Sequence, residues 1–117
     1  MVKKLKLIGL KHGKNRLVFL IEKHKNLSEF LATFLLKCGF EDNLHREYYK
    51  AENIEIERLE DTEENYANEN FDIDIVYGHK TIILLVRLKD DKYKKRVFDA
   101  VYEFCELERK HRVVSKK

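Results

Sequence analysis

The stretch Asn70–Lys89, NFDIDIVYGHKTIILLVRLK, decides the fold class of this chain. Two runs of strand-forming residues flank the dipeptide Gly78-His79, and a glycine in the first position of a two-residue loop is typical of a β-hairpin. The second run, Thr81–Leu88, is apolar on both faces for most of its length. The pattern therefore predicts a hairpin whose second strand lies at the centre of a sheet.

The charged residues of this hairpin share one face in the predicted register. Side chains alternate along a strand, and the two-residue turn pairs Asp74 with Ile83. Asp72 then stands diagonal to Arg87, within reach of an ion pair. We therefore interpret these charges first as an ion pair that marks the strand register, and second as a candidate metal site. The residues on the shared face are Asp72, Asp74, Ile83, Leu85, Arg87 and Lys89.

Upstream, the pattern predicts a second hairpin and a helix. The apolar runs 3–10 and 16–22 flank KHGKN, a loop longer than two residues. The run that begins at Asn26 places apolar residues at helical spacing, and Glu29 completes a capping-box start with Asn26. Gly39 suits the left-handed position that follows a helix.

Downstream of this helix the pattern weakens and then recovers. Ile54 and Ile56 alternate with charges and predict a half-exposed strand, whereas the acidic run 60–70 has no apolar period and is expected to be a loop. After the central hairpin, Asp90 and Asp91 favour the start of a last helix. The apolar stripe of that helix contains Tyr93, Val97, Ala100, Val101, Phe104 and Cys105.

The element order ββαβββα favours the α+β class, with a mainly antiparallel sheet of about five strands and two helices packed on it. The N-terminal hairpin and the strand at Ile54 are expected toward the edges, because charges there discourage strand addition. The 117 residues contain no repeat and no boundary, so 1–117 is expected to form a single α+β domain.

Composition indicates a small globular protein with an unusually charged surface, since 44% of residues are apolar and 38% are charged. Gln, Pro and Trp are absent, which fits a thermophile and equally an AT-rich genome. The two cysteines, Cys38 and Cys105, fall on apolar helix faces, so buried and reduced thiols are expected. No leader pattern and no membrane-length apolar run is present, so we expect a cytoplasmic protein without a membrane partner.

Charge is segregated along the chain. Residues 1–25 carry a net +7, residues 41–75 carry −10, and residues 76–117 carry +6. Basic surfaces of this kind can meet phosphates, and the second basic cluster opens a helix behind a strand, as in double-stranded RNA-binding domains. The predicted nucleic-acid-binding residues are Lys3, Lys4, Lys6, Lys11, Lys14, Arg16, Lys92, Lys94, Lys95 and Arg96.

A helix with Glu29, a GFE exit at 39–41, a strand with an Asp, a hairpin, a strand that ends in charge-x-Lys and a further helix together resemble the restriction-endonuclease-like PD-(D/E)xK core. The resemblance implies that Asp74 would hold Mg²⁺, that Lys89 would steady the attacking water or the phosphate, and that Glu29 would assist. Arg87 occupies the position of the ExK glutamate, and a cation there would repel a metal ion. The resemblance therefore implies an inactive or unusual member of that fold.

We expect a small non-catalytic binding or assembly module whose partner is nucleic acid, with no metal site and no cofactor. One alternative is the metal-dependent nuclease, which would take Mg²⁺. The other is a protein-binding subunit or a homodimer that associates through the last helix or the N-terminal hairpin.

Overall fold

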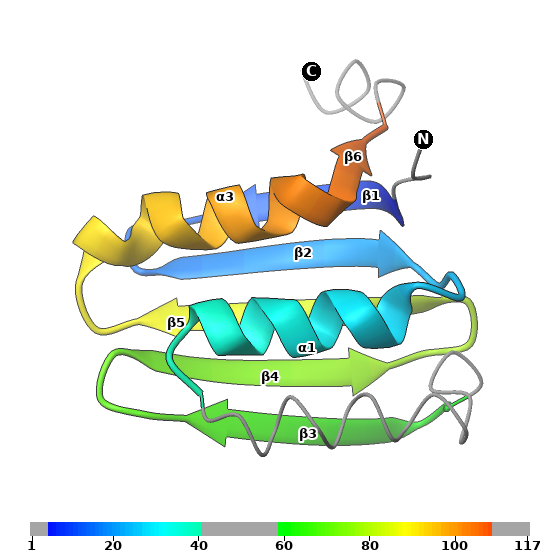
Figure 1. Cartoon of the computed structure of the whole chain (residues 1–117), viewed down its shortest axis with the longest axis horizontal. Helices are drawn as coiled ribbons and strands as arrows, with labels where there is room; N and C mark the ends of the chain where they lie inside the picture. The colour runs from blue at the N-terminus through cyan, green and yellow to red at the C-terminus, as the bar shows by residue number, and fades with distance from the viewer. Residues whose placement is uncertain (1–4, 41–58, 109–117) are drawn as a thin grey trace.

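A computed structural model describes residues 5–40 and 59–108. Within them, six strands form one sheet, and two α-helices cover one of its faces (Figure 1). The helices are α1 (Leu27–Lys37) and α3 (Lys94–Phe104), the latter preceded by the 3₁₀ turn η3 (Asp91–Tyr93). The strands are β1 (Leu5–His12), β2 (Arg16–Glu22), β3 (Thr62–Ala67), β4 (Phe71–Tyr77), β5 (Thr81–Leu88) and β6 (Cys105–Leu107).

The strand order is β3-β4-β5-β2-β1-β6. All neighbours are antiparallel except β1 and β6, which are parallel, so the sheet is mixed. The α+β class and the central position of β5 are confirmed. The N-terminal hairpin lies further inside than predicted, because β2 pairs with β5 and β6 covers the free side of β1.

Two elements differ from the sequence-based expectation. The acidic run 60–70, expected to be a loop, contains β3, because Tyr66 and its neighbours pair in register along β4. The last helix ends at Phe104, where the chain becomes extended and Cys105 pairs with Leu5 of β1. The strand predicted at Ile54 and Ile56 lies outside the described residues.

The central hairpin turns at His79-Lys80 and not at the predicted Gly78-His79. Tyr77 pairs with Ile82, and the Gly78 N–H donates to the Thr81 carbonyl at 2.8 Å. The pairing therefore slips by two residues from the predicted register. Because side chains alternate with a period of two, an even slip leaves every residue on its predicted face.

The two ends of helix α1 are formed by different hydrogen bonds. The predicted capping box at Asn26 is wrong: its side chain makes no cap, and its N–H donates to His24 Nδ1 at 3.1 Å. The predicted left-handed Gly39 is confirmed, with φ of +93°. The Phe40 N–H then donates to the Leu35 carbonyl at 3.1 Å, which satisfies one of the last helical carbonyls.

The core lies between the two helices and the face of the sheet that they cover. Phe30 of α1 contacts Phe104 of α3 with ring centroids 5.7 Å apart, and Phe19 of β2 lies beneath α3 against Phe98. Both cysteines are buried and free, as predicted. No helix in the described ranges is long and apolar enough to cross a membrane.

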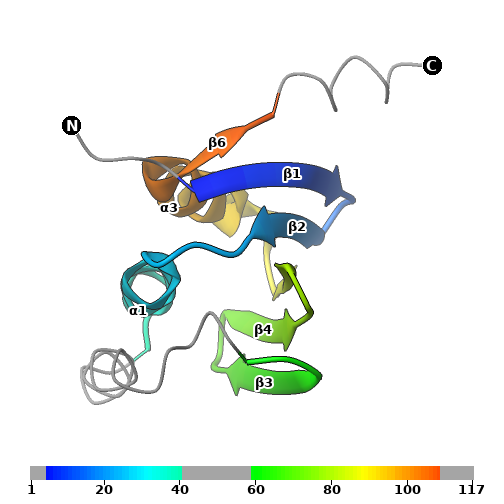
Figure 2. The same ribbon diagram turned by 90° about the vertical axis from the view of Figure 1, so that its right-hand side faces the viewer.

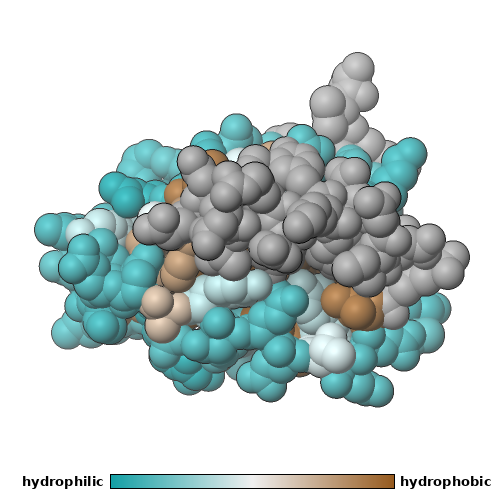
Figure 3. Space-filling model, turned by 60° about the horizontal axis from the view of Figure 1, so that its bottom comes forward, coloured by the Kyte–Doolittle hydropathy of each residue, from teal (hydrophilic) through white to brown (hydrophobic). Residues whose placement is uncertain are grey.

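Both described helices lie on the same side of the sheet, which leaves its other side, the open face, uncovered by them (Figure 2). Strand β3 forms one edge of the described sheet, and the described residues visible from that side are mostly hydrophilic, with a few separate hydrophobic spots (Figure 3). Exposed polar groups such as Thr62 and Glu63 discourage strand addition at this edge.

Candidate functional site

An ion-pair cluster occupies the open face where β3, β4 and β5 adjoin. Asp72 lies directly opposite Arg87, and Arg87 Nη1 is 3.1 Å from Asp74 Oδ2 and 3.6 Å from Asp72 Oδ2. The Asn65 amide donates to Oδ1 of both aspartates, at 2.9 and 2.7 Å. Both oxygens of Asp74 are therefore engaged within the protein. The described residues contain no group of three or more side chains suited to hold a metal.

The three candidate nuclease residues lie in different places. Asp74 projects from β4 on the open face, whereas Glu29 is exposed on α1, which covers the opposite face. Lys89 follows the end of β5, where its N–H donates to the Asn70 carbonyl at 3.1 Å. It is four residues beyond Leu85, the partner of Asp74. The structure brings no two of these three residues into contact.

Two of the predicted basic segments meet at one end of the molecule, the left end in Figure 1. Lys94 at the start of α3 donates from Nζ to the Gly13 carbonyl in the β1–β2 loop, at 2.9 Å. The Leu88 N–H donates to the Asn15 carbonyl of the same loop at 2.8 Å. The β1–β2 loop, the end of β5 and the start of α3 therefore form one surface, which we call the basic end.

Most cations of the basic end are exposed and make no ion pair with the described residues. Lys95 is paired with Asp99 at 2.7 Å, and the Lys92 and Arg96 charges each lie 5.4 Å from the Tyr93 ring centroid. Such rings hold cations in place without neutralising them. The cations of the basic end are Lys11, Lys14, Arg16, Lys89, Lys92, Lys94, Lys95 and Arg96.

Three aspartates lie among these cations. Asp90 caps η3 by accepting a hydrogen bond from the Lys92 N–H at 3.0 Å, and Asp99 pairs with Lys95. Asp91 is in the first turn of η3. The aspartates thus lower the positive charge of the surface, but eight cations against three carboxylates leave it strongly basic.

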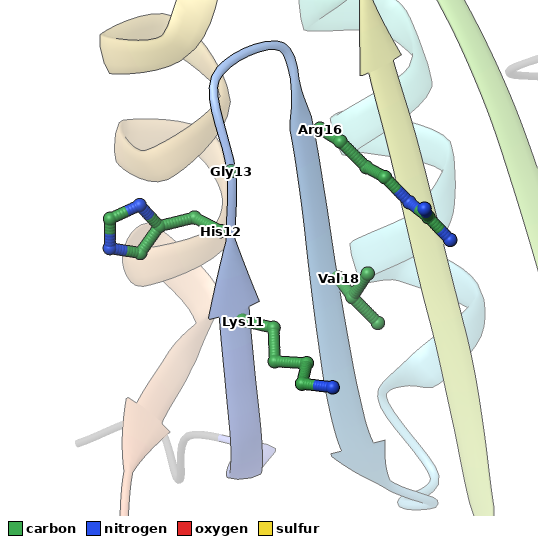
Figure 4. Close-up of a pocket in the computed structure, with 5 residues that line it drawn as sticks. All are labelled: Lys11, His12, Gly13, Arg16 and Val18. Atoms are coloured by element: carbon green, nitrogen blue, oxygen red, sulfur yellow. The ribbon is translucent and has the colours of Figure 1, made fainter.

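An open depression of about 520 Å³ lies beside the β1–β2 loop (Figure 4). Lys11, Arg16 and Val18 line one side of it, whereas His12 points the other way, with its ring centroid 6.2 Å from that of Phe98 in an edge-to-face arrangement. The two cations flanking a shallow opening give a position where an anionic group could be held without being buried.

Other predicted basic residues lie apart. Lys6 is on β1 away from the basic end, 3.9 Å from Glu108, and Lys3 and Lys4 lie outside the described residues. Lys89 belongs to the basic end but is absent from the sequence-based set of nucleic-acid contacts. Lys89 lies there because β2 pairs with β5, and no local pattern in the sequence predicts that pairing.

Comparisons with models of known protein families, with curated proteins and with solved structures found no match to this chain.

Proposed function

We propose that the protein is a small, non-catalytic nucleic-acid-binding module that contacts the phosphate backbone of a duplex through its basic end. The hydrogen bond between Lys94 and Gly13 carries the proposal, because it joins the two predicted basic segments into one surface. Separately, each segment offers three or four cations. Together they offer enough charge to span several phosphates.

Electrostatics favour a polyanion over a single small anion. Most cations of the basic end are exposed, and they are spread over two loops and a helix start. On duplex DNA, each neutralised phosphate releases counterions, and the logarithm of the binding constant falls with the logarithm of salt by about 0.9 per phosphate. Binding is therefore expected to be strong at low salt and to weaken steeply as salt is added.

Side-chain chemistry favours a duplex backbone over an unpaired strand. Single strands are usually bound by stacking of their bases on exposed aromatic rings. Among Phe and Tyr residues of the described ranges, only Tyr102 is as much as 36% exposed, and it lies beyond the first turn of α3. Lys and Arg side chains that contact mainly the phosphate backbone recognise the shape and charge of the duplex, so little sequence preference is expected.

The nuclease alternative has less support from the geometry. Arg87 and Asn65 occupy the oxygens of Asp74, and a metal ion there would have to displace both. Glu29 lies across the sheet from Asp74, so it offers no further ligand.

Binding to duplex DNA and duplex RNA of equal length, titrated from about 50 to 200 mM salt, tests the proposal. Lys14→Gln/Lys89→Gln removes two cations from the basic end and is expected to lower the salt slope by about 1.8, with a matching loss of affinity. Both side chains are exposed and make no ion pair with the described residues, so the fold should be unaffected.

Lys25→Gln/Lys80→Gln is the matched control, because it removes the same charge from exposed positions at the other end of the sheet. It should leave the salt slope almost unchanged. Equal losses in both double variants, or no binding of the native protein at low salt, would overturn the proposal. Mg²⁺-dependent cleavage of either duplex that Asp74→Asn abolishes would replace it with the nuclease alternative.

A further inference from the structure

The open face of the sheet carries a continuous apolar patch, which we call the open-face patch. The register aligns Val76, Ile83 and Leu20 in one row across β4, β5 and β2, and it aligns Leu85 with Val18 in the next. Each of these five residues is partly exposed, and Ile83 is 39% exposed. Large contiguous apolar surfaces usually mark an interaction site.

Charges on the two sides of this patch differ in sign at the end nearest the β1–β2 loop. On the β3 and β4 side lie the carboxylates of Glu63, Asp72 and Asp74, and on the β2 and β1 side lie Arg16 and Lys11. Glu22 lies on the same face at the other end of β2. Arg87, between the two sides on β5, is already paired with the two aspartates. The face is therefore apolar in the middle, and near the β1–β2 loop it is acidic on one side and basic on the other.

We infer that two copies of this chain associate through their open faces, related by a two-fold axis parallel to β5. Such an axis places β5 over its own copy, β2 over β4, and β1 over β3. Ile83 and Leu85 then pack against their counterparts, and Arg16 lies over Asp72 of the other copy. Sheets packed face to face keep their strands within about 30° of each other, which this axis allows.

The second possible axis, perpendicular to β5, makes different contacts. It lays each strand over its own copy in reverse, so Arg16 lies over Glu22 of the other copy, and Asp72 lies over the opposite end of β4. Opposite charges across an interface fix the relative orientation of the partners. A charge reversal at Arg16 and Asp72 therefore distinguishes the two axes.

The area is sufficient for a specific dimer. Five strands at about 4.8 Å spacing and about six residues at about 3.4 Å rise give roughly 500 Å² per copy. Two copies would then bury on the order of 1,000 Å², which is the lower bound for a stable biological interface. If the proposed function also holds, this axis directs both basic ends to the same side.

Sedimentation equilibrium over a concentration series, without nucleic acid, tests the inference. The native protein should be a dimer, and Ile83→Glu should weaken the dimer at least about tenfold, because it places a carboxylate on the symmetry axis in an apolar contact. Leu36→Glu is the matched control: Leu36 is 38% exposed, and it lies on α1 across the sheet. It should leave the dimer intact.

Charge reversal provides a second test that does not depend on the apolar patch. Arg16→Asp should weaken the dimer, and combining it with Asp72→Arg should restore it, because each new charge again faces its opposite across the interface. A native protein that stays monomeric throughout, equal weakening by Ile83→Glu and Leu36→Glu, or no recovery in the charge-reversed pair would overturn the inference. Loss of salt-dependent duplex binding alone would overturn the proposed function and leave the dimer standing.

Discussion

Arg87 determines the chemistry of the ion-pair cluster. A glutamate at this position would add a third carboxylate beside Asp72 and Asp74 and create a plausible cation site. The guanidinium instead supplies the positive charge that the two aspartates need. Its side chain is about half exposed, so the cluster contributes modestly to stability, and its main consequence is to fix which residues face each other across β4 and β5.

Cys38 illustrates how burial alone changes the behaviour of a side chain. Burial raises the pKa of its thiol to about 12, and the nearby Arg96 charge offsets this only in part. The thiol of the folded protein therefore stays protonated at a pH where the unfolded chain, with a pKa near 9.0, loses its proton. Since the folded state binds more protons in this window, the free energy of unfolding must fall as pH rises between about 9 and 12.

Cys38→Ala removes this contribution. The free energy of unfolding of the native protein should fall with pH above 9 more steeply than that of the variant, by up to about 1.4 kcal/mol per pH unit. Denaturant unfolding at several alkaline pH values measures the difference, and lysine titration cancels because both proteins share it. Parallel pH profiles would show that the thiol is not shielded as described.

At the scale of elements, local sequence patterns predicted those features that depend only on residues close together in the chain. The stripe of α1, the left-handed Gly39 and the hairpin of β4 and β5 follow from periodicity and turn chemistry, and each is present. Strand β3 has a sequence, TEENYA, with little apolar alternation, and it is ordered by pairing with β4. Strand β6 follows a helix without a break in the apolar pattern, and only its pairing with β1 makes it extended.

The candidate site also combines features that the sequence predicts with features that depend on long-range contacts. The sequence predicts that the charges of the central hairpin share a face, because that depends only on alternation. It also predicts two basic segments. These two segments adjoin because β2 pairs with β5 and because Lys94 contacts Gly13, which is 81 residues away in the sequence. Contacts at such separation leave no periodic signal, so they could not be predicted from one sequence.

The contrast between β3 and β5 predicts a gradient of backbone stability. Strand β5 is paired on both sides and every second side chain is buried, whereas β3 pairs only with β4 among the described strands and has no fully buried residue. Native-state hydrogen exchange should therefore show amides of β5 exchanging only on global unfolding and those of β3 exchanging faster. Equal protection of β3 and β5 would mean that β3 is covered by more than its pairing with β4.

At the scale of the whole molecule, the two ends of the sheet differ in net charge. The basic end gathers the β1–β2 loop, the end of β5 and the start of α3. At the other end, near the β4–β5 turn, the carboxylates of Glu22, Glu60 and Asp61 lie among Lys23, Lys25 and Lys80, so charges of both signs are mixed there. His79 is 2.8 Å from Glu60. A surface that concentrates like charges opposes folding by self-repulsion, and it is retained where a partner of opposite charge is bound.

Because cations are in excess at the basic end, the free energy of unfolding and the affinity for a duplex should respond in opposite directions to the same substitution. Lys14→Gln/Lys89→Gln, which should weaken duplex binding, relieves repulsion at the basic end and should raise the free energy of unfolding at low salt, by up to about 0.5 kcal/mol. Lys25→Gln/Lys80→Gln removes cations near carboxylates and should give no such gain. At 1 M salt the screening length is about 3 Å, so the difference between the two variants should disappear. A loss of stability in the first variant at low salt would mean that these lysines support the fold, and that the basic end is a structural feature and not a binding surface.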